Sequence, residues 1–107
     1  MSLISSNELK KLRVDEPRLT IIDIRTAPEL LDGKIPGAVW MDVSGKDFIE
    51  KIKALPKDVP YCLYCASGGR TMMVVPFMEE LGFTRVYELD GGIFEWVAEG
   101  NGVEKLQ

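Results

Sequence analysis

The chain has no histidine among its 107 residues and only two cysteines. Without an imidazole, the Cys-His and Ser-His pairs of nucleophilic enzymes cannot form, and most zinc ligand sets are excluded. Too few ligands remain for a zinc site, and we expect neither a metal nor another cofactor. Two cysteines in a chain that we expect in the cytoplasm favour thiol chemistry or simple burial over a structural disulfide.

The sequence also lacks a basic excess and a long apolar run. Its net charge of -4 argues against binding to nucleic acid or to an anionic membrane surface. No stretch approaches the roughly 20 apolar residues of a membrane span, and residues 1–12 lack the apolar core of a secretion signal. We therefore expect a cytoplasmic protein that has neither nucleic acid nor membrane as a partner.

Strand-like and helix-like stretches alternate from end to end, with no repeat or linker between them. A chain of this length fits one domain, which we expect over residues 1–107. Apolar strand patterns lie at residues 18–23, 38–43, 60–64 and 85–89, and helical patterns lie at 5–12, 27–33, 46–55, 71–82 and 93–100. The alternation predicts an α/β fold, a three-layer α/β/α sandwich around a parallel sheet of about five strands.

Three of these elements carry clear local signals. Ser5 is followed three positions later by Glu8, and Thr26 is followed at the same spacing by Glu29. Both pairs have the spacing of a capping box, which predicts a helix beginning after each. The stretch PYCLY at residues 60–64 is continuously apolar, as expected of a central parallel strand buried on both faces.

A loop of small residues, CASGGR at residues 65–70, follows this central strand. In open parallel sheets, ligands bind at the carboxyl ends of strands, and this loop lies at such an end. Its backbone N–H groups, the start of the next helix and the charge of Arg70 would all favour a thiolate on Cys65. We therefore interpret Cys65 as a nucleophile in an anion-binding loop; the alternative is a small buried side chain beside a tight turn.

Five motifs between about residues 4 and 96 resemble, in the right order, those of the single-domain rhodanese family of sulfurtransferases. They are DIR at 23–25 with Glu29, GKIPGA at 33–38, YCASGGRT at 64–71, LGF at 81–83 and LDGGIFEW at 89–96. The resemblance implies the rhodanese fold and a Cys65 that carries sulfane sulfur as a persulfide. Many relatives have histidine where this chain has Lys34, but the Pro-Gly turn that follows it should survive.

The resemblance implies an enzyme of the thiosulfate sulfurtransferase type. Cys65 would be catalytic, and the substrate-binding residues would be Ala66, Ser67, Gly68, Gly69 and Arg70. The expected partners are a small-molecule sulfur donor, an acceptor thiol or cyanide, and a protein that exchanges persulfide sulfur. The alternative is a persulfide carrier or protein-interaction module with little turnover of small molecules.

Phosphatases and arsenate reductases related to this family have a loop one residue longer. Here four residues separate Cys65 from Arg70. This shorter ring resembles the sulfurtransferase type, which is sized for one persulfide sulfur and not for a tetrahedral oxyanion. The loop contains no carboxylate that could serve as the general acid of a phosphatase. Asp23, Asp42 or Glu88 could approach it in space, so this chemistry remains the less favoured alternative.

Cys62 and Cys65 form a C-x-x-C pattern, which raises a redox alternative. On an extended strand, at about 3.3 Å per residue, their Cα atoms would lie roughly 10 Å apart with side chains on opposite faces. A disulfide requires less than about 7 Å. We therefore interpret Cys62 as a core residue.

Outside the loop, we expect mostly structural roles. Asp23 and Arg25 should form charge-assisted hydrogen bonds that tie a strand end to neighbouring loops, with Glu29 as a further partner of Arg25. Gly91 and Gly92 should allow close packing between the last strand and the last helix.

Overall fold

Parallel strands form the centre of the molecule in the computed structural model, which describes residues 2–105. The described residues form a five-stranded sheet with the order β1-β5-β4-β2-β3. The strands are β1 (Ser2–Ile4), β2 (Thr20–Asp23), β3 (Val39–Trp40), β4 (Tyr61–Tyr64) and β5 (Val86–Leu89). Because β4 is the middle strand, the cysteine loop at its carboxyl end begins at the centre of the sheet edge.

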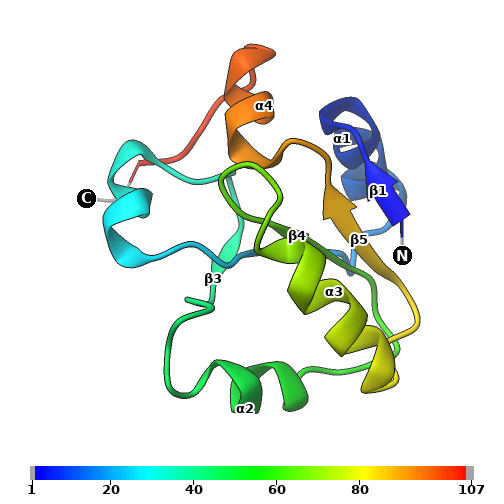
Figure 1. Ribbon diagram of the computed structural model, residues 1–107. Helices are drawn as coiled ribbons and strands as arrows, with labels where there is room; N and C mark the ends of the chain where they lie inside the picture. The colour runs from blue at the N-terminus through cyan, green and yellow to red at the C-terminus, as the bar shows by residue number, and fades with distance from the viewer. Residues whose placement is uncertain (1, 106–107) are drawn as a thin grey trace.

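Helices cover both faces of this sheet (Figure 1). They are α1 (Ser6–Asp15), the 3-10 helix η1 (Ala27–Asp32), α2 (Phe48–Lys53), α3 (Thr71–Glu80) and α4 (Gly92–Ala98). Helices α2 and α3 lie on one side, and α1 and α4 lie on the other. The three-layer α/β/α sandwich predicted from the alternation of elements is therefore confirmed.

The two capping boxes form as their spacing predicts. The Ser5 hydroxyl accepts a hydrogen bond from the Glu8 N–H at 3.1 Å, and the Ser5 N–H donates to the Glu8 carboxylate at 2.9 Å. In the second box, the N–H of Thr26 donates to Glu29 Oε1 at 3.0 Å. This second helix is the short 3-10 helix η1, which brings the Glu29 carboxylate close to the cysteine loop.

Residues of β4 alternate between two apolar cores, which explains why PYCLY is apolar throughout. Leu63 packs on the side of α2 and α3, with side chains such as Ile52 and Val75. Tyr64 packs on the other side, with side chains such as Leu9 and Trp96. Strand β4 is therefore packed on both faces, and its carboxyl end positions the loop.

The structure differs from the sequence prediction at the two edges of the sheet. Strand β1 carries no strand pattern of its own and is defined by its parallel pairing with β5. Strand β3 spans Val39–Trp40, shorter than the predicted 38–43, because this edge strand pairs only with β2. None of the helices in residues 2–105 has the length and apolar character that crossing a membrane requires.

Candidate active site

The loop of residues 66–70 connects the end of β4 to the start of α3. Cys65 lies between the last residue of β4 and this loop. Thr71 begins α3, so the loop passes directly into the amino-terminal end of that helix. Gly68 has a φ of +116°, a backbone conformation that glycine adopts without strain. This turn directs the Gly68 N–H back toward the sulfur, to which it donates at 3.2 Å.

The Cys65 side chain is buried yet surrounded by hydrogen-bond donors. The residue is 1% exposed. Burial alone would raise the pKa of the Cys65 thiol, but hydrogen bonds from the backbone N–H groups of Thr71, Arg70 and Gly68 outweigh it, and the pKa is lowered. The donors around the sulfur therefore favour the thiolate form of Cys65.

Arg70 does not extend freely toward the mouth of the loop. Its Nη1 and Nη2 atoms donate to the two carboxylate oxygens of Glu29 at 2.7 and 2.8 Å, a bidentate ion pair with both side chains about one-third exposed. Hydrogen bonding by Arg70 lowers the pKa of Glu29 to about 2. The sequence suggested Arg25 as the partner of Glu29; instead Arg25 contacts only the Glu29 backbone oxygen, at 3.0 Å.

Helix α4 supports the loop from the other side of the sheet edge (Figure 1). The N–H groups of Ile93 and Phe94 donate to the carbonyl oxygens of Cys65 and Ala66 at 3.0 and 3.1 Å. Gly92 makes this approach feasible, since a Cβ atom there would lie 2.5 Å from both oxygens. The close packing expected of the Gly-Gly pair is thus a contact with the cysteine loop itself.

Asp23 and Arg25 form the predicted charge-assisted contacts behind the loop. The Arg25 guanidinium donates to the Asp23 carboxylate at 2.7 Å and to the Gly33 carbonyl at 2.8 Å. The Tyr64 hydroxyl also donates to Asp23, at 2.6 Å. These buried bonds tie the end of β2 to β4 and to the segment after η1.

The structure places Cys62 on the opposite face of β4 from Cys65. The two belong to different core clusters, and both are free thiols. Burial, followed by the charge of Glu88, raises the pKa of Cys62 to about 12. The interpretation of Cys62 as a core residue is confirmed, and this geometry does not support a redox pair.

Of the three carboxylates that could have approached the loop, Glu88 lies beside it, in contact with the first residue of α3. Asp23 is engaged by Arg25 and Tyr64, and the Asp42 carboxylate accepts from the N–H and hydroxyl of Ser44. Glu88 accepts a hydrogen bond from the hydroxyl of Thr71.

Thr71 was not assigned a role from the sequence, and Glu88 was named only as a carboxylate that could approach the loop. Thr71 is the last letter of the YCASGGRT motif, which is a signal that could have been used. Glu88 follows an ordinary strand pattern, and its position beside Thr71 depends on the pairing of β5 with β4. Within residues 2–105, no three His, Cys, Asp or Glu side chains are grouped closely enough to bind a metal ion.

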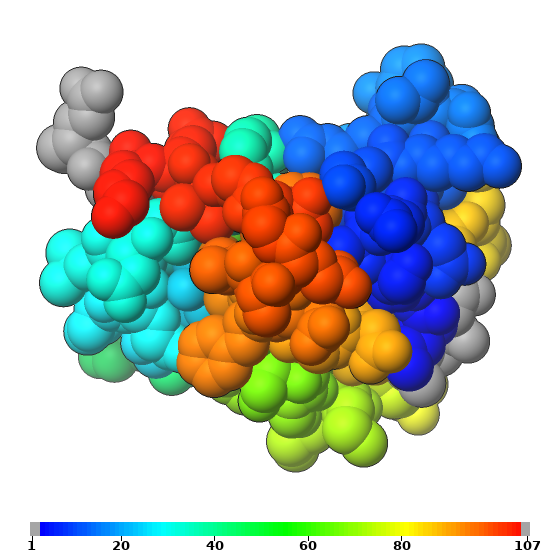
Figure 2. Space-filling view, turned by 90° about the horizontal axis from the view of Figure 1, so that it is seen from above, coloured from blue at the N-terminus to red at the C-terminus, as the bar shows by residue number. Residues whose placement is uncertain are grey.

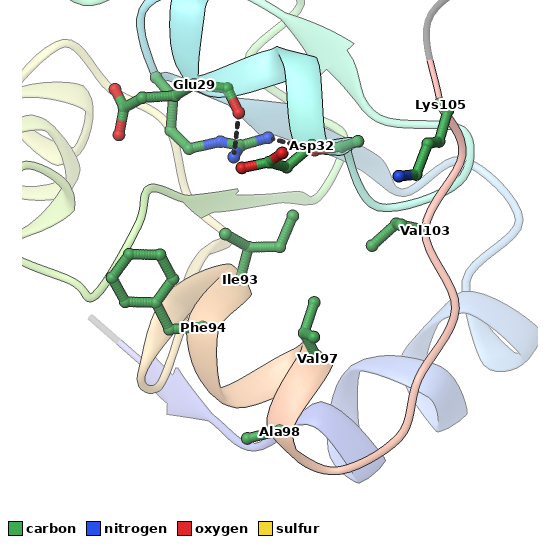
Figure 3. A pocket seen from close by; sticks show the side chains of 10 residues that line it. Glu29, Asp32, Ile93, Phe94, Val97, Ala98, Val103 and Lys105 are labelled. Carbon is green, nitrogen blue, oxygen red and sulfur yellow. Dashed lines mark hydrogen bonds between the residues drawn. The ribbon is translucent and has the colours of Figure 1, made fainter.

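A largely apolar pocket of about 640 Å³ borders this site between η1, α4 and the segment after α4 (Figure 3). Ile93, Phe94 and Val97 of α4 form one wall, and Glu29 lies at its rim. Figure 2 shows α4 on the surface between the segment of η1 and helix α1. The pocket therefore lies next to the Glu29–Arg70 ion pair.

Comparisons with known proteins agree with this architecture. The family model "Rhodanese-like domain" matches residues 5–99. The chain is 39% identical over 97 residues to the "Putative sulfurtransferase YtwF" of Bacillus subtilis, covering 90% of each chain. It is 31% identical over 97 residues to a sulfurtransferase of Allochromatium vinosum, covering 91% of this chain and 89% of that protein.

A solved structure shows the same fold. The rhodanese-related protein of Thermoplasma volcanium superimposes with a TM-score of 0.84 at 30% identity, covering 97% of this chain and 98% of that chain. The rhodanese fold that the five sequence motifs imply is therefore confirmed. The chain belongs to the rhodanese-like domain family, and the two relatives described above are named sulfurtransferases.

Proposed function

We propose that this protein is a sulfurtransferase that moves sulfane sulfur through a persulfide on Cys65. The observation that carries the proposal is the lowered pKa of Cys65, a cysteine that is 1% exposed and encircled by backbone N–H donors. A buried thiol without such donors would be protonated and unreactive. Here the donors favour the thiolate, which is the nucleophile that sulfur transfer requires.

In the first step, the Cys65 thiolate attacks the outer sulfur of a donor such as thiosulfate. A bond forms between Sγ and that sulfur, the S–S bond of thiosulfate breaks, and sulfite leaves with the electron pair. The negative charge now lies on the outer persulfide sulfur. We expect the N–H groups of residues 66–70 to surround this position and to stabilise the charge.

In the second step, an acceptor nucleophile attacks the outer persulfide sulfur. Cyanide would leave as thiocyanate, and a thiol would leave as a persulfide; either reaction returns the Cys65 thiolate. Because the transfer is divided between two half-reactions through a covalent intermediate, we expect ping-pong kinetics.

Arg70 acts in this proposal chiefly on the shape of the loop. Its guanidinium is held by both oxygens of Glu29, so its charge is largely compensated before any donor binds. Ala66, Ser67, Gly68 and Gly69 would bind the transferred sulfur through their backbone N–H groups.

Loading and discharge of one sulfur atom test the proposal. The protein is incubated with thiosulfate, and intact mass spectrometry is used to detect one added sulfur; cyanide is then added and thiocyanate is measured. Wild type and Cys62→Ala should both load and discharge, whereas Cys65→Ser should do neither. A wild type that gains no sulfur and forms no thiocyanate contradicts the proposal, and a sulfur adduct on Cys65→Ser would implicate Cys62.

A persulfide carrier is the second candidate, favoured by apolar side chains at the borders of the loop. Phe94 and Met72 are each 65% exposed. The N–H of Phe94 bonds to the loop, and Met72 lies one residue inside α3. Large exposed apolar side chains are frequent where proteins dock. A protein that loads sulfur but does not discharge it to cyanide or small thiols would favour this function.

A further inference from the structure

The apolar pocket beside the cysteine loop has no part in a transfer of sulfur from thiosulfate to cyanide. Its volume of about 640 Å³ lies within the range of about 300–1,000 Å³ typical of pockets that bind small molecules. Ile93, Val97 and Val103 direct apolar side chains into it (Figure 3). A hydrated anion such as thiosulfate would lose its water shell against these walls without gaining hydrogen bonds. The pocket therefore suits a different ligand.

The segment that follows α4 forms a second wall of the pocket, and hydrogen bonds fix it at both ends. The Trp96 side chain donates to the Gly102 carbonyl at 2.8 Å. The backbone of Glu104 pairs with that of Lys34 through two N–H···O bonds of 2.8 and 2.9 Å. Val103 lies between these two anchors. The pocket is therefore formed before a ligand binds, which lowers the ordering cost of binding.

Two contacts join the borders of the pocket to the cysteine loop. The Glu29 carboxylate, at the rim, binds Arg70 of the loop. Ile93, in the wall, donates its N–H to the Cys65 carbonyl at 3.0 Å. A ligand in the pocket thus lies against a residue that contacts Cys65 directly, and we expect a short extension of that ligand to reach the loop.

The charged groups around the pocket largely compensate one another. The charges of Arg25 and Glu29 are each paired with an opposite charge on a neighbouring residue. Asp32 and Lys105 also line the pocket; within residues 2–105 neither forms a salt bridge, and their charges are opposite. No excess of one sign favours an anionic or a cationic ligand, so a neutral apolar body fits best.

We propose that this pocket binds the apolar body of an organic thiol that accepts sulfur from Cys65. The inference rests on the proposed function in taking the Cys65 persulfide as the source of that sulfur. The thiol gives its proton to solvent, and its sulfur attacks the outer persulfide sulfur. A new S–S bond forms, the bond from Sγ to the outer sulfur breaks with its electron pair returning to Sγ, and the acceptor leaves as its own persulfide. The pocket holds the thiol in position for this attack.

Two thiols of different length test the inference. The protein is loaded with thiosulfate and freed of excess donor, and loss of the added sulfur to 2-mercaptoethanol or 6-mercaptohexan-1-ol is followed by intact mass. Both are neutral primary thiols. The four additional methylene groups of the longer thiol should raise the second-order rate constant by about tenfold or more, because they are buried in the pocket. Equal rate constants for the two thiols would overturn the inference and leave the pocket to a protein segment or another occupant.

Three aspartate substitutions locate the site of this preference. Val97→Asp puts a charge in the pocket and should bring the ratio of the two rate constants close to one; Val97 is 53% exposed, so the fold should tolerate it. Val14→Asp is the matched control on α1, since Val14 is 79% exposed and does not line the pocket, and it should keep the wild-type ratio. Met72→Asp alters a smaller cavity that Met72 and Gly68 line. Loss of the preference in Met72→Asp but not in Val97→Asp would overturn the inference.

Alkylation of Cys65 tests the pocket without a sulfur donor. N-hexyl iodoacetamide carries the reactive group of iodoacetamide and a neutral apolar tail of six carbons. It should modify Cys65 about tenfold faster than iodoacetamide does, because its tail binds in the pocket. Intact mass gives the rates, and peptide mapping confirms the site. Val97→Asp should remove the advantage of the hexyl reagent, and equal rates in the wild type would count against the inference.

The two proposals fail separately in these experiments. If thiosulfate adds no sulfur to the wild type while the hexyl reagent keeps its advantage, sulfur transfer is wrong and the pocket remains a binding site for apolar bodies beside Cys65. If the loaded protein discharges to cyanide but neither the longer thiol nor the hexyl reagent reacts faster, the role of the pocket is wrong and sulfur transfer stands.

Discussion

Cys62 and Cys65 lie three positions apart at the end of the same strand, and both are almost completely buried. Their chemistry is nevertheless opposite, since the pKa of Cys62 rises to about 12 and that of Cys65 falls. Cys62 faces the apolar core beneath α1 and α4, where no N–H donor within residues 2–105 favours its thiolate. The comparison shows that donors around the sulfur, and not exposure, decide which thiol is reactive.

The largest expected difference between the two cysteines is in their rates of alkylation. With a pKa of about 12, roughly one Cys62 side chain in 10⁵ is a thiolate at pH 7. Iodoacetamide should therefore modify Cys65 alone in the native protein, and Cys62 only after denaturation. Peptide mapping after timed labelling measures this, and comparable labelling of both thiols would refute the contrast.

The substitution Gly92→Ala should lower the sulfur-transfer activity that depends on Cys65. The added Cβ would lie 2.5 Å from the carbonyl oxygens of Cys65 and Ala66 and must displace the loop. We expect kcat/KM for sulfur transfer to fall by about tenfold to a hundredfold, because small displacements of reacting groups are costly.

Gly100→Ala is the matched control for this substitution. Gly100 also has a positive φ, +84°, but no atom lies within 4 Å of the position that its Cβ would take. It therefore carries the backbone strain without the contact with the loop. Equal losses of activity in Gly92→Ala and Gly100→Ala would show that strain, and not displacement of the loop, is responsible.

The charge at the mouth of the loop should affect binding of the anionic sulfur donor at Cys65 and should leave Cys62 unaffected. Glu29→Gln weakens the ion pair with Arg70 and releases positive charge toward an anionic donor. Since partly exposed ion pairs contribute up to about 1 kcal/mol, the KM for thiosulfate should fall by up to about fivefold, with kcat little changed. Asp32→Asn removes an equal charge from η1 and should have less effect; an unchanged or higher KM in Glu29→Gln would contradict the prediction.

The smallest expected effect concerns the stability of the loop region at low pH. The pKa of Glu29 is lowered from 4.5 to about 2, so its ion pair stabilises the fold above about pH 4.5, and that contribution is lost as the pH falls toward 2. Because the pair is about one-third exposed, the effect should stay below about 1 kcal/mol. Urea unfolding of wild type and Glu29→Gln at pH 6 and pH 3 measures it, and their difference should shrink at pH 3.

Much of the fold follows from patterns that are local in the chain. The capping pairs at Ser5 and Thr26 define helix starts, and the apolar run 60–64 identifies the central strand. Strand β1 could not be found in this way, because its three residues become a strand only by pairing with β5. The shortness of β3 has the same origin, since pairing with a single neighbour limits its length.

The sequence by itself determined the candidate nucleophile, the four-residue spacing to Arg70 and the α/β class. These depend only on residue types and on spacings of a few positions along the chain. The tertiary structure alone decided which groups meet at the loop. Arg70 binds Glu29 across 41 positions, and Thr71 binds Glu88 across 17. A parallel sheet brings the carboxyl ends of its strands to one edge, so residues far apart in the chain become neighbours there.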